Sequence, residues 1–130
     1  MNAVLMQDAV ALIVEDHDAV RRALRERIQA SFVQLRLREA GSVEEALKIV
    51  ESEKVDYVFM DIRLPGTDGV NGTRMVLERS PNTLVVVVSA LDDASHRAAA
   101  KTAGARAFVS KRAISRELIP AIESLACCGQ

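Results

Sequence analysis

An apolar run that ends in a carboxylate occupies residues 55–61, Val55-Asp56-Tyr57-Val58-Phe59-Met60-Asp61. Three other apolar runs also end in a polar side chain: residues 11–14 before Glu15 and Asp16, residues 84–88 before Ser89, and residues 107–109 before Lys111. Such runs, without polar alternation, are typical of parallel strands covered on both faces. The carboxyl ends of parallel strands meet at one edge of an open α/β sheet, where ligands bind. The sequence therefore predicts a site that gathers carboxylates, a hydroxyl and an ammonium at that edge.

Expected strands and helices alternate along the whole chain. The strands are expected at residues 11–16, 35–38, 55–61, 83–89 and 105–111. Helices are expected around residues 20–28, from 42, over about 70–79, over about 93–103 and from near 115. Single helices between parallel strands make right-handed crossovers. We therefore predict an α/β fold, a flavodoxin-like (βα)5 doubly wound parallel sheet of strand order 2-1-3-4-5, which sets Glu15 and Asp16 beside Asp61.

Two strands differ from the others in pattern. Residues 35–38, Leu-Arg-Leu-Arg, alternate strictly between apolar and charged, which predicts an edge strand with one wet face. Residues 83–89 form the most hydrophobic run and are expected to be a central strand, with a neighbour on each side.

Local signals mark where several helices begin and end. Ser42 with Glu45 three residues later is a capping-box pattern, which predicts a helix start. Gly104 follows the alanine-rich segment and predicts its C-terminal cap. Pro120 lies beyond the first turn of a helix that begins near Ser115, so we expect either a later start or a bend.

Length and composition predict one soluble domain. The chain has 130 residues, of which about 9–126 are expected to form the core, with flexible tails at 1–7 and 127–130. Its formal net charge of -1 gives no basic field for nucleic acid. Residues 1–10 have the pattern of neither a signal peptide nor a membrane span. Cys127 and Cys128 are expected to be reduced, and we predict a cytoplasmic location.

The residue types at the expected edge suit phosphoryl transfer. Three neighbouring carboxylates repel one another unless a cation joins them, and Mg²⁺ (or Mn²⁺) prefers such oxygen ligands. Asp61 can then act as a nucleophile and form an aspartyl phosphate. Lys111 can offer a second positive charge, and Ser89 a hydrogen bond to a phosphoryl oxygen.

Each of these residues also has an ordinary interpretation when it is considered alone. Glu15 and Asp16 could cap a helix, Ser89 could be a strand-end hydroxyl, and Lys111 a surface charge. His17 is expected in the first loop or at a helix start. His96 is expected on the exposed side of a helix, and neither histidine has ligand-like spacing to another His or Cys. Only the joint occurrence at four strand ends favours the phosphoacceptor interpretation.

From about residue 9 to residue 126, this pattern resembles the receiver domain of two-component response regulators (CheY-like). Its most specific part is residues 58–69, Val-Phe-Met-Asp-Ile-Arg-Leu-Pro-Gly-Thr-Asp-Gly. The resemblance implies that Asp61 is the phosphoacceptor and that Asp16 binds the metal directly. Glu15 would act on the metal through water, and Arg63 would supply its backbone carbonyl.

The same resemblance implies a signalling cycle. A sensor histidine kinase or a phosphotransfer protein would donate the phosphoryl group, and the domain would not turn over external substrates as an enzyme does. Lys111 matches the lysine of the family, Ser89 the hydroxyl switch, and Phe108 the aromatic switch, although Phe108 is equally consistent with a core filler. Phosphorylation would remodel the face of the fourth helix, fifth strand and fifth helix, with a possible homodimer as one result.

Two further features concern the variant of the family. Arg112 follows Lys111 where many receivers have a cis proline, and a cis bond before arginine would cost about 3 kcal/mol. The sequence is similar in this to the NarL/FixJ type, so the chain could be the N-terminal part of a helix-turn-helix transcriptional regulator. Arg63 and Leu91 stand where the family tunes phosphoryl lifetime, and we expect Arg63 to screen the acyl phosphate from water.

Three other functions stay open at the level of sequence. A haloacid-dehalogenase-like phosphatase would also use an aspartate and Mg²⁺, but it needs a second aspartate where Arg63 stands. A flavodoxin-type nucleotide module needs Gly, Ser or Thr in its first loop as hydrogen-bond donors to phosphate. In this chain residues 15–18 are Glu-Asp-His-Asp, which repel an anion. The third is a receiver-like scaffold that is never phosphorylated.

Overall fold

A parallel sheet of order β2-β1-β3-β4-β5 organises the computed structural model, which describes residues 8–128 and side chains as far as Ala126. Its strands are β1 (Val10–Val14), β2 (Arg36–Ala40), β3 (Tyr57–Met60), β4 (Leu84–Ser89) and β5 (Ala107–Ser110). Every neighbouring pair is parallel, and Val14 of β1 stands opposite Met60 of β3. The residues that follow these two strands, Glu15 and Asp61, therefore leave the sheet side by side.

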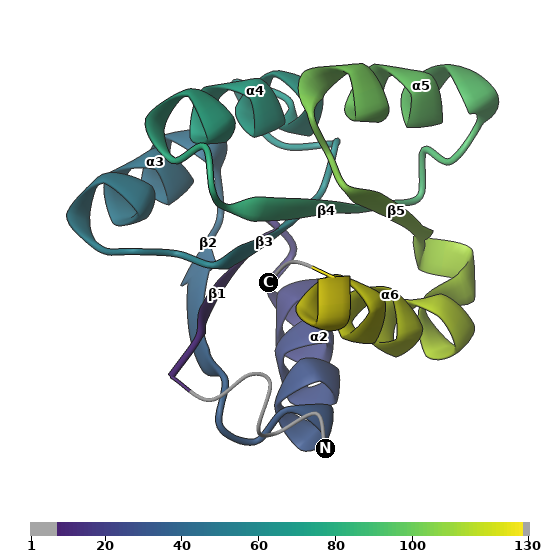
Figure 1. Cartoon of the computed structure of the whole chain (residues 1–130). Coiled ribbons are helices and arrows are strands. Elements are labelled where there is room, and N and C mark those ends of the chain that lie inside the picture. The colour runs from purple at the N-terminus through teal and green to yellow at the C-terminus, as the bar shows by residue number, and fades with distance from the viewer. Residues whose placement is uncertain (1–7, 129–130) are drawn as a thin grey trace.

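Helices cover both faces of the sheet. They are α2 (Asp18–Ser31), α3 (Val43–Ser52), α4 (Gly69–Arg79), α5 (Ala94–Ala103) and α6 (Ile114–Cys128), with a short 3₁₀ turn, η1 (Lys111–Ala113), before α6. Helices α3, α4 and α5 lie along one face, and α2 and α6 along the other (Figure 1). This is the predicted doubly wound arrangement, and the predicted strand order is confirmed.

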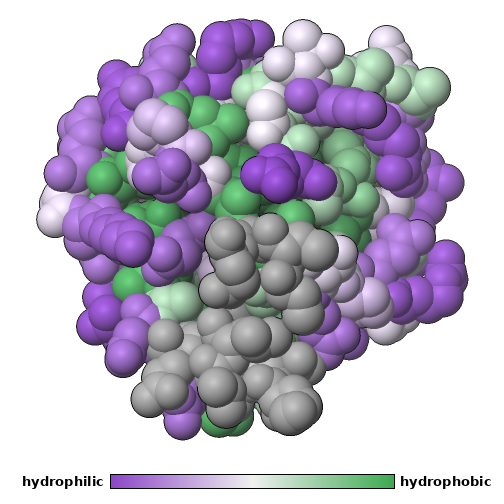
Figure 2. All heavy atoms as spheres, viewed as in Figure 1, coloured by the Kyte–Doolittle hydropathy of each residue, from purple (hydrophilic) through white to green (hydrophobic). Residues whose placement is uncertain are grey.

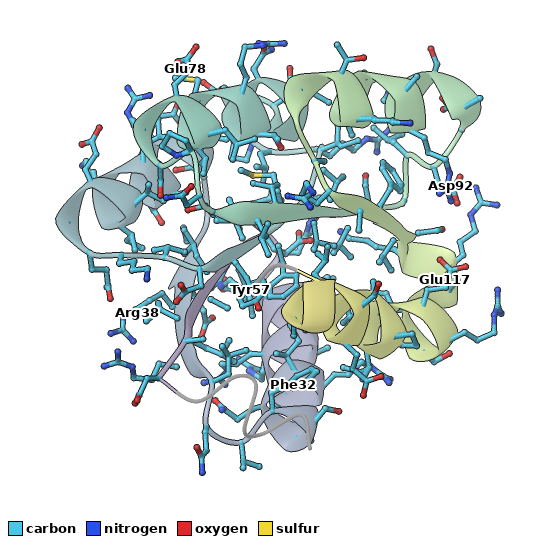
Figure 3. All side chains as sticks on the ribbon, in the orientation of Figure 1. Phe32, Arg38, Tyr57, Glu78, Asp92 and Glu117 are labelled. Atoms are coloured by element: carbon cyan, nitrogen blue, oxygen red, sulfur yellow. The ribbon has the colours of Figure 1, made fainter. Side chains whose placement is uncertain are left out.

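Each face of the sheet has its own apolar core. On one side, Phe32 of the α2 end and Tyr57 of β3 pack with the inner faces of α2 and α6 (Figure 3). On the other side, Val58 and Met60 of the same strand pack against α3, α4 and α5. Successive residues of β3 thus face opposite cores, which is why its sequence is apolar throughout. Hydrophilic residues cover much of the outer surface in Figure 2, with hydrophobic ones visible between them.

The two strands with distinctive patterns lie where they were expected. The alternating segment 35–38 belongs to β2, which is an edge strand as predicted. The prediction that 83–89 is a central strand is confirmed, because β4 lies inside the sheet, between β3 and the edge strand β5. A strand needs partners on both sides to be fully apolar, and β4 meets that condition without being the middle one.

The expected helix signals are mostly confirmed. The Ser42 side chain accepts a hydrogen bond from the Glu45 amide, while the Glu45 carboxylate accepts one from Gly41. Gly104 caps α5 with φ 113°, a left-handed conformation that favours glycine. The late start suggested by Pro120 was wrong, since α6 begins at Ile114 and continues through the proline.

Several expectations fall outside the described part of the chain. The predicted tails include residues 1–7 and 129–130, which are not described, and the same holds for the side chains of Cys127 and Cys128. Across residues 8–128, no peptide bond is cis, so the expected absence of a cis bond before Arg112 is confirmed. Within that range, no helix combines the length and apolar character that crossing a membrane requires.

Candidate functional site

Three side chains from distant parts of the chain meet at the carboxyl edge of the sheet. The Lys111 ammonium donates to Glu15 Oε1 at 2.6 Å and lies 3.3 Å from Asp61 Oδ2. Glu15 follows β1, Asp61 follows β3, and Lys111 follows β5. Both carboxylates are buried, with Glu15 1% and Asp61 4% exposed. The fold therefore brings together the acidic and basic groups that the strand ends predicted.

The loop after Asp61 folds tightly back against it. The Gly69 amide donates to the Ile62 carbonyl at 2.8 Å. A Cβ atom on Gly69 would lie on top of the Asp61 carbonyl, so only glycine fits at this close approach. Asp68 caps α4 by accepting from the amides of Val70 and Asn71. The turns that contain Pro-Gly and Asp-Gly thus fix the backbone of the loop that follows Asp61.

Burial and neighbouring charges shift the pKa values of the two buried carboxylates in opposite directions. Burial raises the pKa of Asp61; the Lys111 ammonium opposes this rise and the Glu15 charge adds to it, which leaves the pKa above its ordinary value. Burial also pushes up the pKa of Glu15, but hydrogen bonds from Lys111 and His17 outweigh it and hold that pKa below the ordinary value. Lys111 and His17 thus favour the charged form of Glu15.

Asp16 and His17 directly follow Glu15, and the three residues together form what we call the acidic corner. Asp16 is partly exposed, yet its Oδ1 atom is buried without a hydrogen-bond partner. His17 is the N-cap residue of α2, as the sequence predicted, and its Nδ1 lies 3.2 Å from Glu15 Oε2. Ligand atoms of Glu15, Asp16 and His17 all lie within 4.8 Å of one another. His17 directly follows Asp16, but it has no ligand-like spacing to a second His or Cys, so no part in a metal site was predicted for it.

Arg63 follows the end of β3, and Ser89 and Leu91 stand at and just after the end of β4. Ser89 is buried at the end of β4, and its hydroxyl oxygen accepts a hydrogen bond from the Leu91 amide at 3.1 Å. Arg63 and Leu91 line the same groove of about 450 Å³, together with His96. His96 is half-buried there and its Nδ1 pairs with Asp93 at 2.8 Å, so the expected exposed position was only partly right.

Phe108 is not a fully buried core residue. It is half-buried on β5, and the Arg97 guanidinium carbon lies 4.7 Å from the centre of its ring. Such a contact is a cation–π interaction. The ring packs against the core on the α3, α4 and α5 side and has a cation on its other side, so the interpretation as a core filler is partly confirmed.

A hydrogen-bond network beside Lys111 was missed by sequence reasoning. The Ser110 hydroxyl donates to Asp92 Oδ2 at 2.5 Å and accepts from the Arg112 amide at 3.2 Å. This hydrogen bond and the nearby Arg112 charge hold the pKa of Asp92 below its ordinary value. Asp92 lies near the end of β5 in Figure 3, so the network ties the loop after β4 to the segment that carries Lys111. Its only sequence signal was a serine directly before the lysine.

Comparison with known proteins identifies the family. The family model for the response regulator receiver domain matches residues 11–123. The chain belongs to this family. It is 33% identical over 115 residues to the response regulator GacA of Pseudomonas aeruginosa, which covers 88% of this chain and 53% of GacA. The chain spans about half the length of the curated relatives it matches.

Solved structures agree with the fold. A LuxR-family two-component response regulator from Aurantimonas superposes with a TM-score of 0.86 at 28% identity, covering 92% of this chain and 85% of that one. The response regulator TrrA from Thermotoga maritima, solved in complex with Mg²⁺ and BeF, gives a TM-score of 0.79 at 25% identity, covering 90% and 98%. The chain is thus a receiver domain of two-component signalling, which disfavours the phosphatase and flavodoxin-type alternatives.

Proposed function

We propose that this receiver domain accepts a phosphoryl group on Asp61 from a phosphohistidine of a sensor kinase or phosphotransfer protein. The observation that carries the proposal is the convergence of Asp61, Glu15 and Lys111 at one strand edge, with Lys111 in contact with both carboxylates. Of the two buried carboxylates at this edge, Asp61 is the one whose pKa lies above its ordinary value, and it shares the Lys111 ammonium with Glu15. In this role the domain acts as a cytoplasmic signalling acceptor and does not turn over an external substrate.

A divalent cation fits the acidic corner of the site. Asp16 Oδ1 is a buried oxygen that lacks a hydrogen-bond partner, and buried polar atoms without partners call for an explanation. Asp16 would hold Mg²⁺ or Mn²⁺ directly, with Glu15 beside it and with Asp61 and the Arg63 carbonyl as further oxygen donors. When bound, the cation supplies neutralising charge to the phosphoryl oxygens.

Asp61, Lys111 and Ser89 then have different roles in phosphoryl transfer. A carboxylate oxygen of Asp61 attacks phosphorus, and the new O–P bond forms as the P–N bond of the donor breaks. The donor imidazole leaves with the electron pair of that bond and takes a proton from solvent. Lys111 sits 3.3 Å from Asp61 Oδ2 and can follow the phosphoryl group with its positive charge. Ser89 can turn its hydroxyl from the Leu91 amide toward a phosphoryl oxygen.

Intact-mass analysis with a small phosphodonor such as acetyl phosphate tests the proposal. We expect one added phosphoryl group in the presence of Mg²⁺, which disappears when hydroxylamine cleaves the acyl phosphate. The adduct should be absent without a divalent cation and absent in Asp61→Asn. A stable adduct in Asp61→Asn would move the acceptor to another residue, and the complete lack of an adduct in wild type would favour the non-phosphorylated scaffold.

The groove beside Asp61 is proposed to set the lifetime of the phosphoryl group. Arg63 and Leu91 line it from two different loops, one after β3 and one after β4. A long cationic side chain there can shield the acyl phosphate from attacking water. We therefore expect Arg63→Ala to lose its phosphoryl group several-fold faster than wild type. An unchanged rate of dephosphorylation, measured by intact mass over time, would remove this role for Arg63.

A further inference from the structure

The acidic corner contains a nitrogen donor as well as oxygens. His17 Nδ1 lies 3.2 Å from Glu15 Oε2 and 3.4 Å from Asp16 Oδ1. Donor atoms that share one ion at bond lengths near 2.1 Å stand roughly 3.0 Å apart in octahedral and roughly 3.4 Å apart in tetrahedral geometry. The two observed separations fall within that interval. The spacing of His17 Nδ1 from both carboxylates is therefore that of ligands sharing a single ion, and the three ligand atoms lie within 4.8 Å of one another.

Glu15 Oε2 accepts a hydrogen bond from the His17 amide and pairs with His17 Nδ1, so an ion bound at this corner would replace the Nδ1 contact. Lys111 occupies Glu15 Oε1, so the other oxygen, Oε2, is the one that faces His17. Asp16 Oδ1 has no hydrogen-bond partner, and its 3.4 Å contact with His17 counts as an ion pair only when the imidazole is protonated. The His17 side chain is 71% exposed, so an ion can reach its ring from solvent.

We propose that His17 supplies an imidazole nitrogen to the divalent cation of this site, which therefore prefers Mn²⁺ to Mg²⁺. This inference rests on the proposed function for the presence of a cation at Asp16. Mg²⁺ favours oxygen ligands and keeps several waters, whereas imidazole suits first-row transition ions. A nitrogen ligand thus adds affinity for Mn²⁺ and little for Mg²⁺. The same reasoning gives still tighter binding of Co²⁺ and Ni²⁺, which follow Mn²⁺ in the order of affinities.

A purely structural role for His17 is the competing explanation. The His17 amide donates to Glu15 Oε2 at 3.2 Å, and the residue caps α2. In that case the ring would only order the turn, and its removal would weaken the binding of Mn²⁺ and Mg²⁺ equally. The ratio of the two affinities separates the explanations.

Pulsed electron paramagnetic resonance of bound Mn²⁺ tests the proposal on untagged protein. The chain has two histidines, so a ¹⁴N coupling of the imidazole type must come from His17 or His96. We expect the coupling in wild type and in His96→Ala, the matched control, and its loss in His17→Ala and in His17→Gln. Titration should show Mn²⁺ affinity reduced about 10-fold in both His17 variants, as for other residues around metal sites, with Mg²⁺ affinity unchanged.

Two outcomes would overturn the inference: wild-type Mn²⁺ without ¹⁴N coupling, or an equal loss of Mn²⁺ and Mg²⁺ affinity in the His17 variants. These outcomes are separate from the test of phosphorylation. Wild-type protein that shows the coupling and yet fails to be phosphorylated would keep the nitrogen ligand and remove the proposed function. Phosphorylation of Asp61 without any coupling would do the reverse.

Discussion

Lys111 joins two carboxylates of unequal character. Glu15 is its closer partner, and the pKa of Glu15 lies below the ordinary value, whereas the pKa of Asp61 lies above it. An ammonium held by Glu15 can stay in place while the charge on Asp61 changes. We infer that Glu15 holds the Lys111 ammonium beside Asp61, in addition to its position next to Asp16, the proposed metal ligand.

Because the pKa of Asp61 is raised, its ionised carboxylate destabilises the folded state when no metal is bound. A carboxyl whose folded pKa exceeds its unfolded value costs nothing below the unfolded pKa, near pH 4, because it is neutral in both states. The cost develops as pH rises through the folded pKa and is complete above it. In EDTA, Asp61→Asn should therefore unfold at a higher temperature than wild type at pH 7, and the difference should vanish near pH 4 and below.

Thermal melts across this pH range check the prediction. The control is Glu26→Gln, which removes an exposed carboxylate of α2 and should follow wild type at every pH. A lower melting temperature of Asp61→Asn at pH 7 would mean that the Lys111 contact outweighs burial, contrary to the direction of the pKa shift.

Individual residues show where sequence reasoning reached its limit. Asp61, Glu15 and Lys111 could be found because each directly follows an apolar strand, and the strand order then brings them together. The hydrogen bonds of Ser110 with Asp92 and Arg112 could not, since they depend on how two loops meet. The contact of Phe108 with Arg97 could not be predicted either, since the sequence does not specify where Arg97 lies relative to the ring.

At the scale of elements, α4 shows how packing overrides propensity. Its sequence contains Gly72 and is weakly patterned, so its boundaries were the least certain of the expected helices. A Cβ on Gly72 would stand 2.6 Å from a methyl group of Val43 and 3.2 Å from Met60. The glycine lets α4 approach α3 and β3 closely, a requirement that arises from the neighbouring elements and leaves no mark in the periodicity of α4 itself.

Strand β5 and helix α5 carry the proposed aromatic switch. The Arg97 guanidinium over the Phe108 ring stabilises the half-exposed position of that ring, by about 0.5–1 kcal/mol for an exposed contact. A change of that size is small enough for phosphorylation to reverse. We propose that the ring leaves Arg97 and turns inward when Ser89 moves toward the phosphoryl group.

The chain has no tryptophan, so Phe108→Trp gives a fluorescence signal from this position alone. With Mg²⁺ and beryllofluoride as a phosphoryl mimic, we expect its emission to shift to shorter wavelength as the ring becomes more buried. The same variant with Asp61→Asn should show no shift. Emission that stays constant while beryllofluoride raises the melting temperature would argue against movement at residue 108.

At the scale of the whole molecule, the strand order creates the site. Lys111 and Glu15 are separated by 96 positions in the sequence. They lie at the same edge of the sheet because each follows the carboxyl end of a parallel strand, β5 and β1. The fold class and strand order could be predicted from alternating strands and helices, since few topologies satisfy right-handed crossovers. The contacts between the strand ends could not be predicted from the sequence, because the conformation of the loops decides which atoms face one another.

Locating the acyl phosphate by chemical reduction tests the central claim most directly. Borohydride converts an aspartyl phosphate to homoserine, and tandem mass spectrometry of the phosphorylated chain then reports its position. We predict homoserine at residue 61 in protein treated with acetyl phosphate and Mg²⁺, and aspartate at residue 61 when Mg²⁺ is omitted. Homoserine at Asp16 or any other carboxylate, with residue 61 unmodified, would contradict the account.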